Sequence, residues 1–219
     1  MTTVIRFMIA EGVPIQTVIF ILMLPVIATL IALVRQIIGL KGFGLYTPLI
    51  VAFAFVATGL RYGILIFLAV LLFGTAMRVI VKQFRLLYLP RMAIVISVVS
   101  LAILFMFAEG AYSGRTGFIA SSIFPVLIII TLVENFVAAQ IEQGTRSAFL
   151  LTLETLALAI TSFFVITWEW AQDLVLQYPW IIFVMLGVNI LLGRYTGLRF
   201  TEYVRFREVI KHAELPQKK

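Results

Sequence analysis

Two glutamates in strongly apolar stretches are the residues of this sequence best suited to do chemistry. Glu134 lies in LVENFVAAQIEQGTRS (residues 132–147), and Glu154 lies in LLTLETLA (residues 150–157). A carboxylate near the middle of a membrane span costs roughly 2.5–3.5 kcal/mol on insertion scales, so it usually faces protein or water and has a partner. If these stretches cross a membrane, the pair points to a site for a proton, a cation or a polar ligand.

Three further polar side chains are expected near the two glutamates. The spans that carry Glu134 and Glu154 run in opposite directions from a shared turn, which puts both residues near 10 Å from it at a rise of ~1.5 Å per residue. Arg35 ends the first predicted span, Arg194 ends the last, and Asn189 lies shortly before it. We therefore predict a polar cluster in the cytoplasmic half of the membrane.

Two interpretations of this cluster remain open. Its arginines could snorkel toward the interface and pair with the glutamates, so that the cluster only joins helices. Alternatively, it could form a proton, ion or substrate site that opens to the cytoplasm.

Catalytic motifs and metal-ligand patterns are absent from the sequence. The chain has no cysteine, its single histidine is His212, and its single aspartate is Asp173, so neither a thiolate site nor an intramembrane aspartate pair is available. No GxSxG, HExxH or phosphate-loop motif occurs. A chain with seven spans invites comparison with rhodopsins, but the last predicted span contains no lysine that could hold retinal. We therefore predict no catalytic residue, no metal and no cofactor.

The composition is that of an integral membrane protein. Of the 219 residues, 63% are hydrophobic and only 12% are charged, and the mean hydropathy is +1.13. Soluble domains have about 25% charged residues. The net charge of +7 is best explained by membrane topology and anionic headgroups, because no polar domain is present to carry a nucleic-acid-binding surface.

The apolar runs predict an all-α fold, a polytopic membrane bundle of seven transmembrane helices. Pro25 should kink the first helix, and the second and third should form an antiparallel hairpin. The fifth should bend near Ser121, Ser122 and Pro125. Residues 168–179 are predicted as an interfacial loop because they contain two Trp and a Tyr. The predicted spans are residues 15–38, 47–60, 64–81, 92–108, 118–139, 148–167 and 180–192.

The positions of lysine and arginine predict the orientation. With seven spans, only Arg6, Arg61 and Arg115 fall on one side, and the other fourteen of the 17 basic residues fall on the opposite side or in the tail. By the positive-inside rule, the C-terminus is cytoplasmic and the N-terminus is outside.

Three segments follow from this arrangement. Residues 1–14 are a short extracytoplasmic lead, residues 15–196 form the seven-helix transmembrane domain, and residues 197–219 form a cytoplasmic basic tail. The tail is predicted to be an amphipathic helix on the anionic leaflet, or else a charge cluster that stops transfer. The basic residues expected to contact the membrane surface or a partner are Arg199, Arg205, Arg207 and Lys211.

Four motifs resemble a known bacterial family. They are LPVIATLIALVRQIIGLKGFGLYTP (residues 24–48), RLLYLPRMAIV (85–95), FPVLIIITLVENFVAAQIEQGTR (124–146) and GRYTGLRFTEYVRFRE (193–208). They are similar to the seven-transmembrane domain that is usually fused to an inactive transglutaminase-like domain. The resemblance implies a bacterial inner-membrane protein that works beside an ATP-grasp ligase in peptide modification. Only fourteen residues precede the first span, so the transglutaminase-like part is expected to be a separate protein or absent.

These observations lead to one leading function and two alternatives. The leading prediction is a non-enzymatic membrane module of a peptide-handling or peptide-modification system, which docks or signals to a cytoplasmic ATP-grasp ligase. The first alternative is a small proton-coupled transporter that uses the intramembrane carboxylates. The second is a membrane enzyme.

Overall fold

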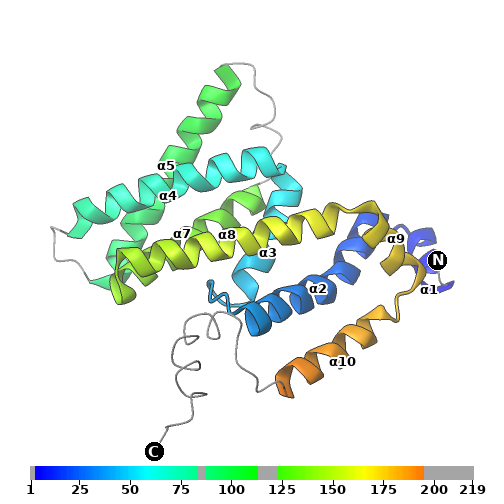
Figure 1. Cartoon of the computed structure of the whole chain (residues 1–219). Helices are drawn as coiled ribbons and strands as arrows, with labels where there is room; N and C mark the ends of the chain where they lie inside the picture. Colours follow the sequence, from blue (N-terminus) through cyan, green and yellow to red (C-terminus); the bar gives the residue numbers. More distant parts are fainter. Residues whose placement is uncertain (1–2, 83–86, 113–122, 195–219) are drawn as a thin grey trace, which may run out of the picture. The chain divides into compact units, whose positions relative to one another are not determined.

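The computed structural model describes residues 3–82, 87–112 and 123–194, and these residues are helical with short connections and no strand (Figure 1). The chain divides into two compact units. The first contains Met1–Lys41 and Glu169–Lys219, and the second contains Gly42–Trp168. The all-helical prediction is confirmed for the described part of the chain.

The first unit is built around α2 (Ile15–Leu33), which continues as a π-helical turn, η1 (Val34–Ile38). It also contains α9 (Glu169–Gln177) and α10 (Ile181–Arg194), both of which contact α2. The short helix α1 (Thr3–Ala10) lies at the N-terminal end. Residues 15–38 were predicted as the first span, and they form one apolar helical segment long enough to cross a membrane.

The segment between the last two predicted spans is a helix, so its prediction as a loop was wrong. It forms α9, which has no internal Gly or Pro and ends before Pro179. Val175 and Leu176 are buried against α1 and α2. Glu169 and Asp173 are exposed on the same helix, so α9 has an apolar part and a polar part. The chain bends by 103° between α9 and α10. If α10 crosses the membrane, α9 therefore lies close to the membrane plane, which suits its amphipathic sequence.

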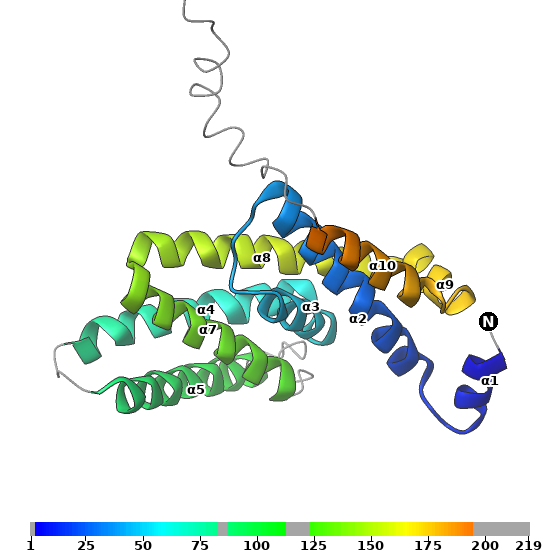
Figure 2. The same ribbon diagram turned by 90° about the horizontal axis from the view of Figure 1, so that it is seen from below.

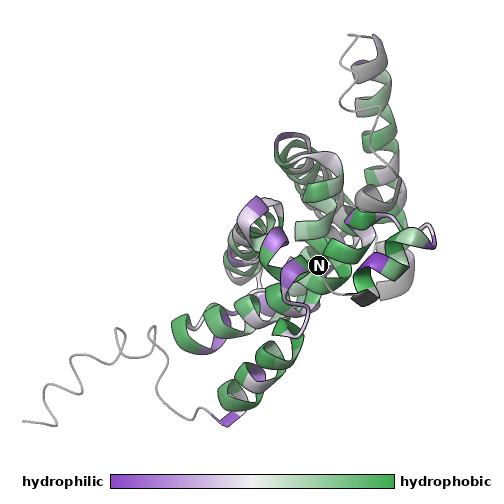
Figure 3. Ribbon diagram, turned by 90° about the vertical axis from the view of Figure 1, so that its right-hand side faces the viewer, coloured by the Kyte–Doolittle hydropathy of each residue, from purple (hydrophilic) through white to green (hydrophobic). Residues whose placement is uncertain are grey.

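The described residues of the second unit form five helices. They are α3 (Tyr46–Thr58), α4 (Leu60–Lys82), α5 (Tyr88–Tyr112), α7 (Ile123–Gln143) and α8 (Thr145–Thr167). Helix α3 packs against both α7 and α8, while α4 packs against α5 and α7 (Figures 1 and 2). Hydrophobic residues cover most of the described helices (Figure 3). Such helices are stable when surrounded by lipid rather than water.

A single residue joins α3 to α4. Gly59 has φ +77° and ends α3, and the chain turns by 120° into α4. A Cβ on Gly63 would lie 2.5 Å from Phe55 Cδ1 and 2.8 Å from Thr58 Oγ1, so only glycine allows this approach. The two helices therefore form a bent pair, and its 120° turn falls short of the full reversal of the predicted antiparallel hairpin.

The number of spans is only partly visible in the helix lengths. Among the described residues, two segments are long and apolar enough to span alone, Ile15–Ile38 and Thr145–Thr167. The count rises to four if each bent pair, α3 with α4 and α9 with α10, is one span. The bend predicted in the fifth span lies partly outside the described residues, because Ser121 and Ser122 precede α7. The predicted basic tail also lies outside the described residues.

Candidate functional site

Glu154 and Thr155 on α8 hold the non-helical linker that precedes α3. The Gly42 amide donates to Glu154 Oε2 at 2.9 Å, and the Phe43 amide donates to Thr155 Oγ1 at 2.8 Å. The Thr155 hydroxyl in turn donates to the Leu151 carbonyl at 2.7 Å. Non-helical backbone at membrane depth needs such partners, because lipid offers none. This arrangement is called the linker cradle below.

Glycine is required in the linker cradle for two reasons. Gly42 has φ +44° and Gly44 has φ +67°, a region that favours glycine. A Cβ on Gly42 would lie 3.2 Å from Thr155 Oγ1, so a side chain there would crowd the hydroxyl. The close approach of backbone to α8 thus depends on the absence of a side chain at Gly42.

A second polar contact joins α7 to the start of α3. Asn135 Nδ2 donates to Thr47 Oγ1 at 3.4 Å, which is a long hydrogen bond. Beside it lies a cavity of about 150 Å³ between the two helices. This volume holds a few waters or an ion but is below the ~300 Å³ of ordinary small-molecule sites. The residues that line it are Thr47, Ile50, Val51, Ile128, Thr131 and Leu132.

Glu134 and Glu154 lie at matching distances from the turn at Gly144. Glu134 is as far before the end of α7 as Glu154 is after the start of α8, about 13 Å along each helix. Their environments differ, however, because Glu154 is half-buried and Glu134 is exposed. Only Glu154 contacts the linker.

The other three predicted site residues belong to the first unit. Asn189 Nδ2 donates to Thr29 Oγ1 at 2.7 Å and to the Met185 carbonyl at 2.9 Å. The Thr29 hydroxyl donates to the Pro25 carbonyl at 2.7 Å, which completes a chain between α10 and α2. Asn189 therefore links two helices.

The two predicted arginines lie at helix ends in this unit. Arg35 is half-buried on η1, and Arg194 is the exposed last residue of α10. The polar cluster that combines them with Glu134 and Glu154 stays a prediction. Arg199, Arg205, Arg207 and Lys211 lie outside the described residues.

Sequence reasoning missed the linker cradle as a unit. Thr155 and Asn135 were not among the predicted site residues, although each directly follows one of the two glutamates. A usable signal was present: KGFG (residues 41–44) concentrates glycines before a predicted span, and Glu154 and Thr155 form an adjacent polar pair. What the sequence lacked was the pairing of segments 112 residues apart.

The chemistry available at the linker cradle is hydrogen bonding and ion or proton contact. Within the described ranges, no group of three or more His, Asp and Glu residues could hold a metal ion. The polar side chains at the cradle are a carboxylate and a hydroxyl, and each accepts a hydrogen bond from a backbone amide. These groups suit the positioning of backbone and the binding of polar ligands.

Comparison with known proteins identifies the family. Neither the curated proteins nor the solved structures contain a match. Residues 3–210 match the family described as seven transmembrane helices usually fused to an inactive transglutaminase. This match covers nearly the whole chain and agrees with the resemblance carried by the four sequence motifs. The protein is therefore a membrane-embedded, multi-pass member of this seven-transmembrane, transglutaminase-associated family.

Proposed function

We propose that this protein is a non-enzymatic membrane module of a peptide-handling or peptide-modification system. The observation that carries the proposal is the family match over residues 3–210, because the usual fusion partner in that family is an inactive transglutaminase. In this proposal, the inactive transglutaminase-like fold binds a peptide without catalysing a reaction. The membrane part attached to such a domain serves to anchor it and to transmit its state.

The proposed module spans the membrane seven times in a bacterial inner membrane. Its N-terminus is outside, where a transglutaminase-like domain or protein would act, and its C-terminus is cytoplasmic. The support is the charge distribution, with fourteen of 17 basic residues on the proposed cytoplasmic side. The tail residues Arg199, Arg205, Arg207 and Lys211 would bind anionic lipid and a cytoplasmic ATP-grasp ligase.

The docking step is tested with purified components. The full chain in nanodiscs is mixed with a purified ATP-grasp ligase of the glutamate-ligase type, and binding is measured by pull-down. Replacing Arg205, Arg207 and Lys211 together by Gln should abolish binding. A control variant with Arg6 and Arg61 replaced by Gln should bind normally. Equal binding by both variants would refute docking through the tail.

A second candidate function is a small proton-coupled transporter. The linker cradle favours it, because Glu154 is a carboxylate on an apolar helix that contacts non-helical backbone, and such carboxylates mark proton and ion pathways in membrane proteins. The cavity between α3 and α7 is large enough for water or an ion. In this proposal Glu154 couples proton movement to a change in the linker.

Proteoliposomes separate the two candidates. For a transporter, Glu154→Gln should abolish proton-driven uptake of a labelled dipeptide, whereas Glu142→Gln, near the end of α7, should retain it. For a docking module, neither the parent protein nor either variant moves protons or dipeptide. Ligase binding would then persist in Glu154→Gln.

A further inference from the structure

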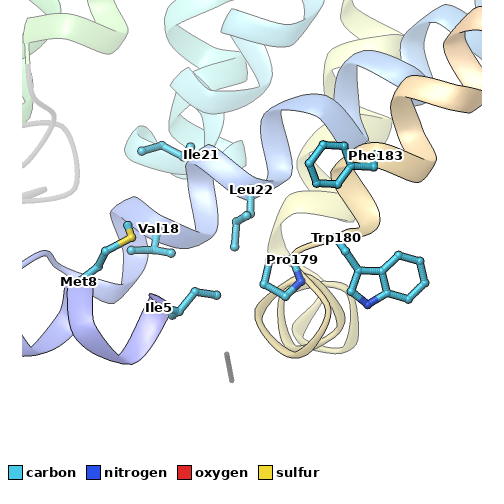
Figure 4. Close-up of a pocket in the computed structure, with 8 residues that line it drawn as sticks. All are labelled: Ile5, Met8, Val18, Ile21, Leu22, Pro179, Trp180 and Phe183. Atoms are coloured by element: carbon cyan, nitrogen blue, oxygen red, sulfur yellow. The ribbon is translucent and has the colours of Figure 1, made fainter. Parts of the chain in front are cut away.

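The first unit contains an apolar pocket where α1, α2 and the start of α10 meet (Figure 4). Its volume is about 410 Å³, within the ~300–1,000 Å³ range of small-molecule sites. Ile5, Leu22 and Pro179 converge on it from three segments. The other lining residues are Met8, Val18, Ile21, Trp180 and Phe183.

The pocket has a closed floor and an open rim. Ile5, Val18 and Leu22 are at most 8% exposed, and they belong to the core of this unit. In contrast, Ile21, Trp180 and Phe183 are 56%, 59% and 76% exposed. The protein therefore supplies a fixed apolar floor and leaves the rim uncovered.

If α2 spans the bilayer, two markers put this pocket in one leaflet. Helix α2 begins at Ile15, so Val18 and Leu22 lie about 4 and 10 Å along it, within the first half of a ~30 Å hydrocarbon core. At the start of α10, Tyr178 and Trp180 pack edge to face with centroids 6.2 Å apart. Tyr and Trp concentrate at membrane interfaces, so both markers give the same level.

We propose that this pocket binds one acyl chain of a phospholipid from the leaflet in which α2 begins. All eight lining residues are apolar, so water gains no hydrogen bonds there, whereas a chain of methylene groups fills the space favourably. The exposed rim opens the pocket to the lipid phase, where acyl chains are the abundant apolar molecules. This site is independent of the proposed function.

The C-terminal segment of this chain is a poor occupant. Helix α10 starts at the pocket and ends at Arg194, about 20 Å away along its axis. Residues 195–219 follow Arg194 in the sequence, and their many charges do not suit an apolar pocket. A second copy of the chain is the remaining competitor, and the experiment distinguishes it.

The test uses Trp180 as an internal reporter. Replacing Trp168 and Trp170 by Phe leaves Trp180 as the sole tryptophan of the full chain. The protein in detergent is titrated with lysophosphatidylcholine whose acyl chain is brominated, and Trp180 fluorescence is recorded. We expect one component of the quenching to saturate at one probe molecule per chain. A second component should rise in proportion to the fraction of probe in the micelle.

Matched substitutions on α2 locate the quenching. Ile21→Phe adds bulk at the pocket rim without disturbing the buried core, so the saturable component should be lost. Leu24→Phe makes a similar change on an exposed part of α2 outside the pocket and should keep it. Phe183→Ala, which removes the most exposed rim residue, should weaken probe retention.

Three outcomes would overturn the proposal. The first is quenching that rises only in proportion to the probe fraction in the micelle. The second is equal saturable quenching in the Ile21→Phe and Leu24→Phe variants. The third is quenching that appears only when the protein is diluted and sedimentation shows a dimer dissociating, which would identify a second copy as the occupant.

Discussion

At the residue scale, Thr155 uses one hydroxyl for two hydrogen bonds. It accepts from the Phe43 amide and donates to the Leu151 carbonyl, so its donor and one of its acceptor sites are used at a buried position. Thr152, one turn earlier, is also buried, but the hydrogen bond seen for its hydroxyl goes to its own helix, at the Ala148 carbonyl. The two threonines thus differ in one interaction, the contact with the linker.

Thr155→Val should therefore cost more stability than Thr152→Val. Valine preserves the shape, but at residue 155 it leaves the Phe43 amide without an acceptor, at a cost of about 1–2 kcal/mol. Thr152→Val frees only a helical carbonyl that keeps its backbone bond, so its cost should be below about 0.5 kcal/mol. The free energy of unfolding in mixed micelles measures both. Equal values would show that the linker contact contributes nothing.

Asn189 and Thr29 should be energetically coupled. Their hydrogen bond joins α10 to α2, and interhelical bonds of this kind measure about 0.6 kcal/mol on average, with a maximum near 1.7. A double-mutant cycle with Asn189→Leu and Thr29→Val should give a coupling energy in this range. Additive effects of the two substitutions would mean that each residue acts alone.

At the element scale, the bend between α3 and α4 depends on close helix packing. Gly63 lies on α4 one turn after Gly59, and a methyl group there would collide with the Phe55 ring and the Thr58 hydroxyl of α3. Gly187 on α10 offers a comparison, because a Cβ there would meet nothing within 4 Å. Substituting each of the two helical glycines by alanine therefore distinguishes the effect of close packing from the effect of helix propensity.

Gly63→Ala should destabilise the protein, while Gly187→Ala should not. Overpacking typically costs about 1–3 kcal/mol, and the collision at Gly63 is with the side chains that set the bend. At Gly187 the higher helix propensity of alanine should leave stability unchanged or raise it by up to about 1 kcal/mol. Thermal unfolding of the two variants in the same detergent tests this. A stable Gly63→Ala protein would contradict the packing argument.

Helix α9 was not predicted from the sequence, whereas the helix over residues 15–38 was. Residues 15–38 are mostly apolar, with few polar side chains such as Thr29 and Arg35, so hydropathy alone located that helix. The segment EWAQDLVLQ has low mean hydropathy and two tryptophans nearby, which fitted a loop at the interface equally well. Its helical state comes from Val175 and Leu176 packing on α1 and α2, a tertiary contact that no local pattern reports.

The candidate site was predictable to a similar, limited degree. The cost of burying charge singled out Glu154 without a structure, but not Thr155 beside it. The contact between Glu154 and the Gly42 amide could not be foreseen. The depth of a residue along its helix determines neither the direction in which its side chain points nor the distant segment that packs against it. Asn189 was expected to line a site, and its partner on α2 is seen only in the fold.

At the scale of the whole molecule, the absence of native cysteine makes the proposed orientation directly testable. With the N-terminus outside, α9 lies on the extracytoplasmic side and the end of α4 lies in the cytoplasm. A single cysteine at Asp173 should react with a membrane-impermeant maleimide in intact spheroplasts. A single cysteine at Lys82 should react only after permeabilisation. The reverse pattern would invert the topology.

The linker cradle also sets an order of events during biosynthesis. Gly42 and its acceptor Glu154 are separated by 112 residues, so the ribosome emits the linker long before α8 exists. At about 5–20 residues per second, roughly 6 to 22 s pass between the two. During that interval the Gly42 and Phe43 amides lack their final acceptors, which favours holding this segment at the aqueous boundary or within the insertion machinery. These two amides can therefore form their final hydrogen bonds only after α8 has been synthesised.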